Sequence, residues 1–164
     1  MTTFAAPPAR FEAGTPPIAE AVGLGAAVDF LEAQGMAAIA DHERALVRRL
    51  HDGLAARDRV RVYGPADAAD RAAAIVAFGV DGVHSADLAV FLDLAGVAVR
   101  AGHHCTQPLH ARLGAPGGTC RASLALYNTA DEVDAFLARL GAVLADLDGA
   151  DGFVPLDVDA ALEG

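Results

Sequence analysis

The sequence contains no lysine, and all twelve of its basic residues are arginines. Chemistry that needs an amine side chain, above all a Schiff base with a carbonyl cofactor, is therefore beyond this chain alone. Cysteine is also scarce. Cys105 and Cys120 are too few for a disulfide framework, so we expect a reducing, cytoplasmic compartment. The sequence has no apolar run long enough to span a bilayer and no signal-peptide pattern at its N-terminus.

Acidic residues outnumber basic ones, and the formal net charge is −10 with a pI near 4.8. This balance argues against nucleic acid or an anionic membrane as a partner. With 164 residues, of which 54% are hydrophobic, the chain can bury a real core. We expect one domain over residues 1–148, followed by an acidic, mobile tail over residues 149–164.

Apolar periodicity predicts helices and strands in alternation. The first helix is expected to begin with Thr15 as N-cap and Pro16 as its first residue. Thr129 and Glu132 predict a capping box at the last helix. The helices are expected at residues 16–34, 36–54, 84–95 and 129–147, and the strands at 59–65, 72–80, 97–102 and 120–127. The fold class predicted is α/β, a two-layer small domain with helices packed on a short mixed sheet of about four strands.

One short segment, RAGHHCTQPLH at residues 100–110, concentrates the reactive side chains. A zinc site is one interpretation, with His103, His104, Cys105 and His110 as possible ligands. Adjacent histidines on an extended loop point in different directions, however, and no C-x-x-C motif completes a ligand set. An ordinary loop with an incidental cysteine is a second interpretation, because free cysteines are more often inert than catalytic. A third is a sulfur nucleophile, Cys105, whose thiolate Arg100 or a protonated histidine would favour.

The same segment resembles the active-site cysteine loop of the SUF-type (group II) cysteine desulfurases, in the class V aminotransferase family of pyridoxal-phosphate fold type I. Two further stretches are similar to the same enzymes: residues 7–36 to their entry into the small domain, and residues 120–140 to their closing strand and helix. The resemblance covers roughly residues 7–145. It implies the C-terminal small domain of such an enzyme, with residues 1–15 as the connecting segment from a large domain.

The resemblance implies a role for each matching residue. Cys105 would be the nucleophile that takes sulfur from L-cysteine and carries it as a persulfide. Arg121, with Arg100, would bind the substrate, Arg121 by pairing with its carboxylate. Two further pairs match family motifs: His103 and His104 in the active-site loop, and Gly14 and Thr15 as phosphate contacts to pyridoxal phosphate from the neighbouring subunit of a dimer.

Other residues receive no catalytic role. Cys120 is expected to pack as a small hydrophobic side chain in its strand, and His42, His51 and His84 are assigned no function. No metal is expected.

The lysine that holds the cofactor in this family belongs to the large domain. We therefore expect the sulfur-accepting part of a cysteine desulfurase that serves iron–sulfur cluster assembly and is inactive alone. The expected partners are L-cysteine, a large-domain polypeptide or homodimer partner, and a small sulfur-acceptor protein. A non-catalytic persulfide carrier or interaction module is the alternative.

Overall fold

The computed structural model describes residues 3–71 and 73–149. These fall into two compact units, Met1–Ile39 and the chain from Ala40 onward. Apart from Gly149, where the last helix ends, the tail expected over residues 149–164 lies outside the described residues.

The first unit contains a 3-10 turn, Ala9–Phe11, and helix α1, Ile18–Gln34. The expectation that Thr15 caps this helix and that Pro16 begins it is wrong. Pro17 is the N-cap residue, and no side chain caps the helix. The physical reason is that a proline disfavours the helical conformation of the residue before it, so the pair Pro16–Pro17 delays the helix to Ile18.

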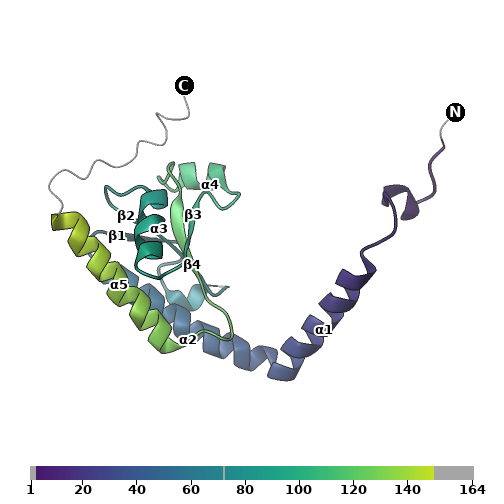
Figure 1. Ribbon diagram of the computed structural model, residues 1–164, viewed down its shortest axis with the longest axis horizontal. Helices are drawn as coiled ribbons and strands as arrows, with labels where there is room; N and C mark the ends of the chain where they lie inside the picture. The colour runs from purple at the N-terminus through teal and green to yellow at the C-terminus, as the bar shows by residue number, and fades with distance from the viewer. Residues whose placement is uncertain (1–2, 72, 150–164) are drawn as a thin grey trace. The chain divides into compact units, whose positions relative to one another are not determined.

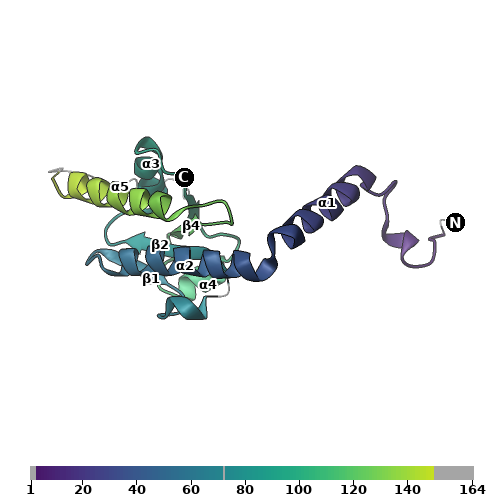
Figure 2. The same ribbon diagram turned by 90° about the horizontal axis from the view of Figure 1, so that it is seen from below.

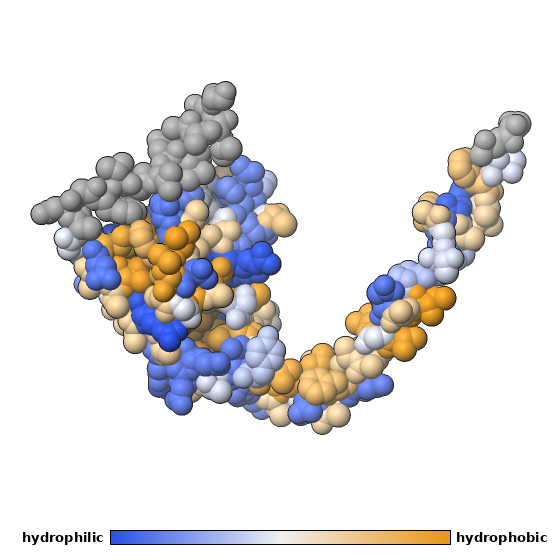
Figure 3. Space-filling model, in the orientation of Figure 1, coloured by the Kyte–Doolittle hydropathy of each residue, from blue (hydrophilic) through white to orange (hydrophobic). Residues whose placement is uncertain are grey.

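Helix α1 buries none of its residues, although its side chains are mostly apolar. Ile18, Val22, Leu24, Val28 and Phe30 are each between 46% and 70% exposed, and they form much of the orange surface of this helix in Figure 3. A helix that is apolar on all sides is normally buried by another chain, domain or apolar phase. Among the described helices none could cross a membrane by itself; α1 and α2 pass that test of length and composition only as a bent pair.

The second unit is built on a sheet of four strands in the order β1-β2-β4-β3. The strands are β1 (Val60–Tyr63), β2 (Ile75–Val80), β3 (Arg100–Gly102) and β4 (Thr119–Ser123). The α/β class and the strand number are confirmed. The expected mixed sheet is not, because all three strand pairs are antiparallel.

Three helices cover one face of this sheet: α2 (Met36–Ala55), α3 (Ser85–Leu94) and α5 (Ala130–Gly149). Figures 1 and 2 show α2 and α5 running side by side. The core between helices and sheet contains Leu50 of α2, Leu92 of α3, Leu140 of α5 and Phe78 of β2, all at most 1% exposed. Burial alternates along β2, so its neighbouring residues face the opposite side of the sheet.

The predicted capping box at α5 is confirmed. The backbone N–H of Thr129 donates to Glu132 Oε2 at 2.8 Å, and the N–H of Glu132 donates to Thr129 Oγ1 at 3.2 Å. The bond from the Thr129 N–H, together with one from the side-chain amide of Asn128, lowers the pKa of the Glu132 carboxyl. Arg49 of α2 forms an ion pair with Asp134 of α5. Its Nε donates to Oδ1 at 2.5 Å and its Nη2 donates to Oδ2 at 2.6 Å, so the pair joins the two helices.

Candidate active site

Every charged side chain in the four strands is an arginine, in a chain whose net charge is −10. Arg121 of β4 lies opposite Arg100 of β3 on one side and Ala77 of β2 on the other. Arg61 of β1 lies opposite Gly79, two residues from Ala77 and therefore on the same side of the sheet. The three arginines thus share the face that the core helices leave uncovered.

Arg121 and Arg100, the two residues expected to bind substrate, are cross-strand neighbours. Like charges in this arrangement repel each other unless an anion lies between them. The Nε of Arg121 is buried and has no hydrogen-bond partner among the described residues. A buried donor without a partner is costly, and a carboxylate would satisfy it with two parallel hydrogen bonds. The face therefore fits a small carboxylate ligand.

The loop that carries Cys105 follows β3 directly. Gly102, the last residue of the strand, has φ +110°, and His104 and Cys105 have φ +50° and +61°. Such angles are uncommon in residues other than glycine and cluster at functional sites. Cys105 is exposed, and helix α4 (Gln107–Arg112) begins two residues later. The sequence predicted a loop here and missed this short helix.

Gly118, just before β4, packs against the backbone of Gly102, where the loop begins. It has φ +82°, and a Cβ on it would lie 2.7 Å from the carbonyl carbon of Gly102 and 2.8 Å from its oxygen. Real Cβ atoms do not approach backbone that closely. The strand that leads into the cysteine loop therefore packs against a position that only glycine can occupy.

We expect Gly118→Ala to destabilise the second unit by about 2–4 kcal/mol, from the unfavourable φ and the contact with β3 together. The measurement is urea-induced unfolding followed by circular dichroism. Gly141→Ala is the matched control, because Gly141 lies inside α5 and a Cβ added there would meet no atom within 4 Å. At this position alanine should raise the free energy of unfolding by up to about 1 kcal/mol. Equal effects of the two substitutions would contradict the packing described for Gly118.

The histidines of the loop and of α4 lie within hydrogen-bond distance of oxygen atoms. His103 Nε2 lies 2.6 Å from the carbonyl oxygen of Pro116. His104 Nε2 lies 3.1 Å from the carbonyl oxygen of Thr119, and His110 Nε2 lies 3.1 Å from the Thr119 hydroxyl. In the described part of the chain, no three His, Cys, Asp or Glu side chains are placed to hold a metal ion.

Burial lowers the pKa of His104, and the positive charge of Arg121 lowers it further; the hydrogen bond that His104 Nε2 donates to the Thr119 carbonyl oxygen acts in the opposite direction. His104 is therefore uncharged at neutral pH. Arg100 or a protonated histidine was expected to favour the thiolate of Cys105, and the lowered pKa of His104 disfavours that role for His104 at neutral pH. Arg121 is close enough to influence this pKa, so the structure brings the loop near the arginine that was expected to bind substrate.

The two cysteines differ sharply in environment. Cys120 is fully buried, as expected for a packed strand residue, and its thiol donates to the carbonyl oxygen of Ser85 at 3.2 Å. Burial raises the pKa of Cys120 to about 12. Cys105 is exposed.

We therefore expect iodoacetamide to label Cys105 at least about 100-fold faster than Cys120 in the folded chain at neutral pH. The thiolate is the reacting form, and Cys120 is fully buried with its pKa raised to about 12, so almost none of it is thiolate. Mass mapping of the labelled peptides measures the ratio. In denaturant the two rates should converge. Similar rates in the folded chain would show that Cys120 is accessible, against the burial described.

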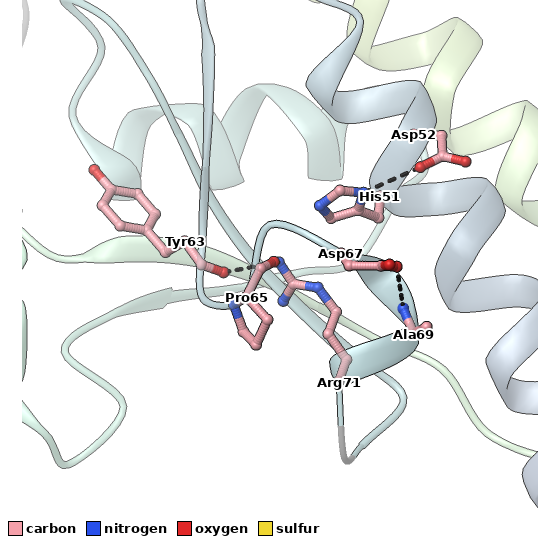
Figure 4. A network of polar contacts seen from close by, with 7 residues as sticks. All are labelled: His51, Asp52, Tyr63, Pro65, Asp67, Ala69 and Arg71. Carbon is pink, nitrogen blue, oxygen red and sulfur yellow. Dashed lines mark hydrogen bonds and ion pairs between the residues drawn. The ribbon is translucent and has the colours of Figure 1, made fainter.

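A shallow, mostly apolar pocket of about 220 Å³ lies beside the loop. Its lining includes Tyr63 at the end of β1, Gly64 after it, Leu109 of α4, Leu113 just after α4, and Thr119. Arg71 stabilises the turn at Tyr63–Pro65 that forms one side of the pocket. Figure 4 shows its guanidinium against this turn. It donates to the carbonyl oxygens of Tyr63 at 3.0 Å and Pro65 at 3.2 Å.

The remaining histidines, His42, His51 and His84, each have a polar partner in the fold. His51 is buried on α2 beside Asp52, 3.1 Å away (Figure 4). His84 caps α3 by accepting from the N–H of Ala86, and His42 donates to the carbonyl oxygen of Asn128.

Gly14 and Thr15, the expected phosphate contacts, lie in an exposed bend of the first unit. A Cβ on Gly14 would meet no atom within 4 Å. A hydroxyl and free N–H groups in a bend suit an anion, but the chain has no lysine to hold the cofactor itself. These residues offer one part of a cofactor site and not a complete one.

Sequence reasoning missed three residues of this region: Arg61, Thr119 and His110. His110 was considered only as a zinc ligand. Arg61 carried a detectable signal, because alternation along RVRVY at residues 59–63 places it on one strand face. Thr119 gave none, because only the pairing of β3 with β4 brings it beside the histidines.

Comparisons with known proteins agree with this geometry. A family model described as Aminotransferase class-V matches residues 1–136. The chain is 53% identical over 138 residues to a probable cysteine desulfurase of Halobacterium salinarum, covering 84% of this chain and 32% of that protein. It is 47% identical over 139 residues to a cysteine desulfurase of Serratia proteamaculans, covering 85% and 33%.

Solved structures show the same relation. An apo cysteine desulfurase of Thermococcus onnurineus matches with a TM-score of 0.79 and 40% identity, over 88% of this chain and 35% of that one. An S-sulfonic acid form of a cysteine desulfurase from Escherichia coli matches with a TM-score of 0.74 and 38% identity, over 84% and 33%. The chain thus spans about one third of the length of these relatives. Their family depends on pyridoxal phosphate. On the family match over residues 1–136, the chain belongs to the class-V aminotransferase family.

Proposed function

We propose that this chain is the sulfur-accepting part of a cysteine desulfurase, which converts L-cysteine to L-alanine and a protein-bound persulfide for iron–sulfur cluster assembly. The observation that carries the proposal is the position of Cys105, an exposed thiol on a loop that leaves the strand of Arg100. The buried, unpartnered Nε of Arg121 on the neighbouring strand fits the substrate carboxylate. The SUF-type subgroup and a cytoplasmic location are part of the same proposal.

In the proposed reaction the thiolate of Cys105 attacks the sulfur atom of L-cysteine. A sulfur–sulfur bond forms and the carbon–sulfur bond of the substrate breaks. The electron pair of that bond stays with the substrate carbon, which takes up a proton to become the methyl group of alanine. Arg121, with Arg100 beside it, would hold the carboxylate so that the sulfur atom faces Cys105.

The residues of this chain fit pyridoxal phosphate only in part. Gly14 and Thr15 would contact its phosphate across a dimer interface, but no residue among the 164 is a lysine that could hold it covalently. When bound, the cofactor supplies an electron sink for breaking bonds to an amino acid. We propose that the cofactor and its lysine belong to a separate large-domain segment.

The proposed protein partners follow from the surfaces of each unit. The exposed apolar side chains of α1 (Ile18, Val22, Leu24, Val28 and Phe30) suit a polypeptide partner, either a large-domain segment or a second copy. Residues 1–15 would connect to such a segment. The exposed position of Cys105 suits transfer of its persulfide to a small acceptor protein.

A chimera tests the function. Residues 1–149 of this chain would replace the matching third of the Serratia proteamaculans cysteine desulfurase, leaving that enzyme's lysine-bearing part intact. The chimera should produce alanine from L-cysteine and a persulfide on Cys105, whereas this chain alone should produce no alanine. A folded chimera that binds the cofactor and substrate but produces no alanine would count against the proposal.

The absence of lysine also favours a second candidate, a persulfide carrier or interaction module that never meets the cofactor. This candidate predicts an inactive chimera, while the chain alone accepts sulfur on Cys105 from a polysulfide donor and passes it to a thiol. The two assays together separate the candidates.

A further inference from the structure

Thr119, the first residue of β4, connects two histidines of the active-site region through a single side chain. It is only 1% exposed. Its hydroxyl lies 3.2 Å from His104 Nε2 and 3.1 Å from His110 Nε2, and its carbonyl oxygen lies 3.1 Å from His104 Nε2. The ring centroids of the two histidines are 5.7 Å apart. A loop residue and a helix residue therefore meet at one strand residue.

These contacts determine which imidazole nitrogens carry hydrogen. A carbonyl oxygen only accepts, so His104 must donate from Nε2 to Thr119. His110 Nδ1 lies 3.1 Å from the carbonyl oxygen of Thr106, so His110 must donate from Nδ1. In a neutral ring Nε2 of His110 is then an acceptor, and the Thr119 hydroxyl donates to it. Every hydrogen bond in this set is satisfied with both histidines neutral.

His104 is thereby left with a lone pair on Nδ1, which has no hydrogen-bond partner among the described residues. The next residue is the exposed Cys105, and both have positive φ angles. Protonation of His104 is opposed by its burial, by Arg121 on β4, by His110 on α4 and by His103 within the loop. The free Nδ1 therefore carries no proton at neutral pH.

We propose that Thr119 is a positioning residue that holds His104 as the Nε2–H tautomer, leaving its Nδ1 to accept the proton of the Cys105 thiol. The inference rests on the proposed role of Cys105 as the reacting thiol. In this step the S–H bond breaks, the electron pair stays on sulfur, and the proton moves to Nδ1. The N–H on Nε2 continues to donate to the Thr119 carbonyl oxygen while the ring is charged. His110 keeps the Thr119 hydroxyl oriented.

The first measurement is the nitrogen-15 NMR spectrum of the imidazole rings in the full 164-residue chain at pH 7. His104 should show a hydrogen on Nε2 and a bare Nδ1, and His110 the opposite pattern. His103, which donates from Nε2 to Pro116 independently of Thr119, is an internal reference. A hydrogen on Nδ1 of His104 would overturn the proposal.

The second measurement is the rate of Cys105 alkylation by iodoacetamide as a function of pH, in four forms of the chain. Thr119→Ser keeps the hydroxyl and Thr119→Val removes it at nearly constant shape. His104→Gln keeps an N–H donor for the Thr119 carbonyl oxygen but removes the basic nitrogen. At pH 7 the rate should be kept in the serine variant and fall about three- to tenfold in the other two, because an ordinary thiol is only a few per cent ionised there.

Thermal unfolding of each variant shows whether the valine form is folded; if it is not, His104→Gln and the wild-type spectrum decide alone. A pH profile of His104→Gln that superimposes on that of the wild type would overturn the proposal. Neither measurement uses cofactor or L-cysteine. An inactive chimera with the expected tautomers would therefore reject the proposed function and leave this inference standing. An active chimera in which His104 carries its hydrogen on Nδ1 would support the proposed function and overturn this inference.

Discussion

Replacing Cys105 with alanine in the chimera should abolish persulfide formation on this chain and reduce alanine production to background. The substitution removes the only exposed thiol of the described residues and little else, because the side chain is at the surface. Cofactor binding should be unchanged, since Cys105 has no part in the proposed phosphate contacts. The effect on the free energy of unfolding should be within about 0.5 kcal/mol.

Persulfide is measured by alkylation and mass mapping, alanine by amino-acid analysis and cofactor by absorbance. Cys120→Ala is the matched control. It should keep persulfide formation but lower stability by about 1 kcal/mol or more, because Cys120 is fully buried and donates a hydrogen bond. Full persulfide formation in the Cys105→Ala chimera would show that the loop is not the sulfur acceptor.

The second large effect is expected from Arg121→Ala, which should weaken L-cysteine binding by about 1.5–3 kcal/mol, or roughly 10- to 150-fold. The carboxylate would lose a charged, two-hydrogen-bond partner. Stability should not fall and should rise slightly, because Arg100 loses its like-charged neighbour and the unpartnered Nε is removed. Removal of a merely structural arginine would lower stability and leave the affinity for L-cysteine unchanged.

Substrate affinity in the chimera and the unfolding midpoint are the two measurements for Arg121. Arg121→Lys should recover only part of the affinity, since an ammonium cannot form the two parallel bonds. Arg44→Ala, which removes a surface arginine paired with Asp41 on α2, should leave affinity unchanged. If Arg121→Ala destabilises the chain without changing affinity, the arginine belongs to the fold and not to the binding site.

The sequence predicted those features that depend on local pattern. Helices α2, α3 and α5 follow from apolar spacing, and the start of α5 follows from the reciprocal bonds of Thr129 and Glu132. Cys105 was correctly expected on a loop leaving a strand. Each of these signals spans only a few residues.

Features that depend on distant residues could not be predicted. Thr119 lies 15 residues from His104 along the chain, and only the antiparallel pairing of β3 with β4 joins them. Helix α4 has six residues and a proline near its start, too short for a periodic signal. The N-terminal error at Thr15 was local, and came from reading Pro16 without the effect of Pro17 on it.

The position of β3 in the sheet has a consequence for motion. It has three residues and pairs only with β4, at the end of the described strand order. Opening it would break few hydrogen bonds and expose little of the core that β2 and β4 share with the helices. We therefore expect amides of residues 100–106 to exchange with deuterium through local opening, at far lower free energy than the global unfolding that β2 requires. The arm that carries Cys105 can then fluctuate while the rest of the unit stays folded.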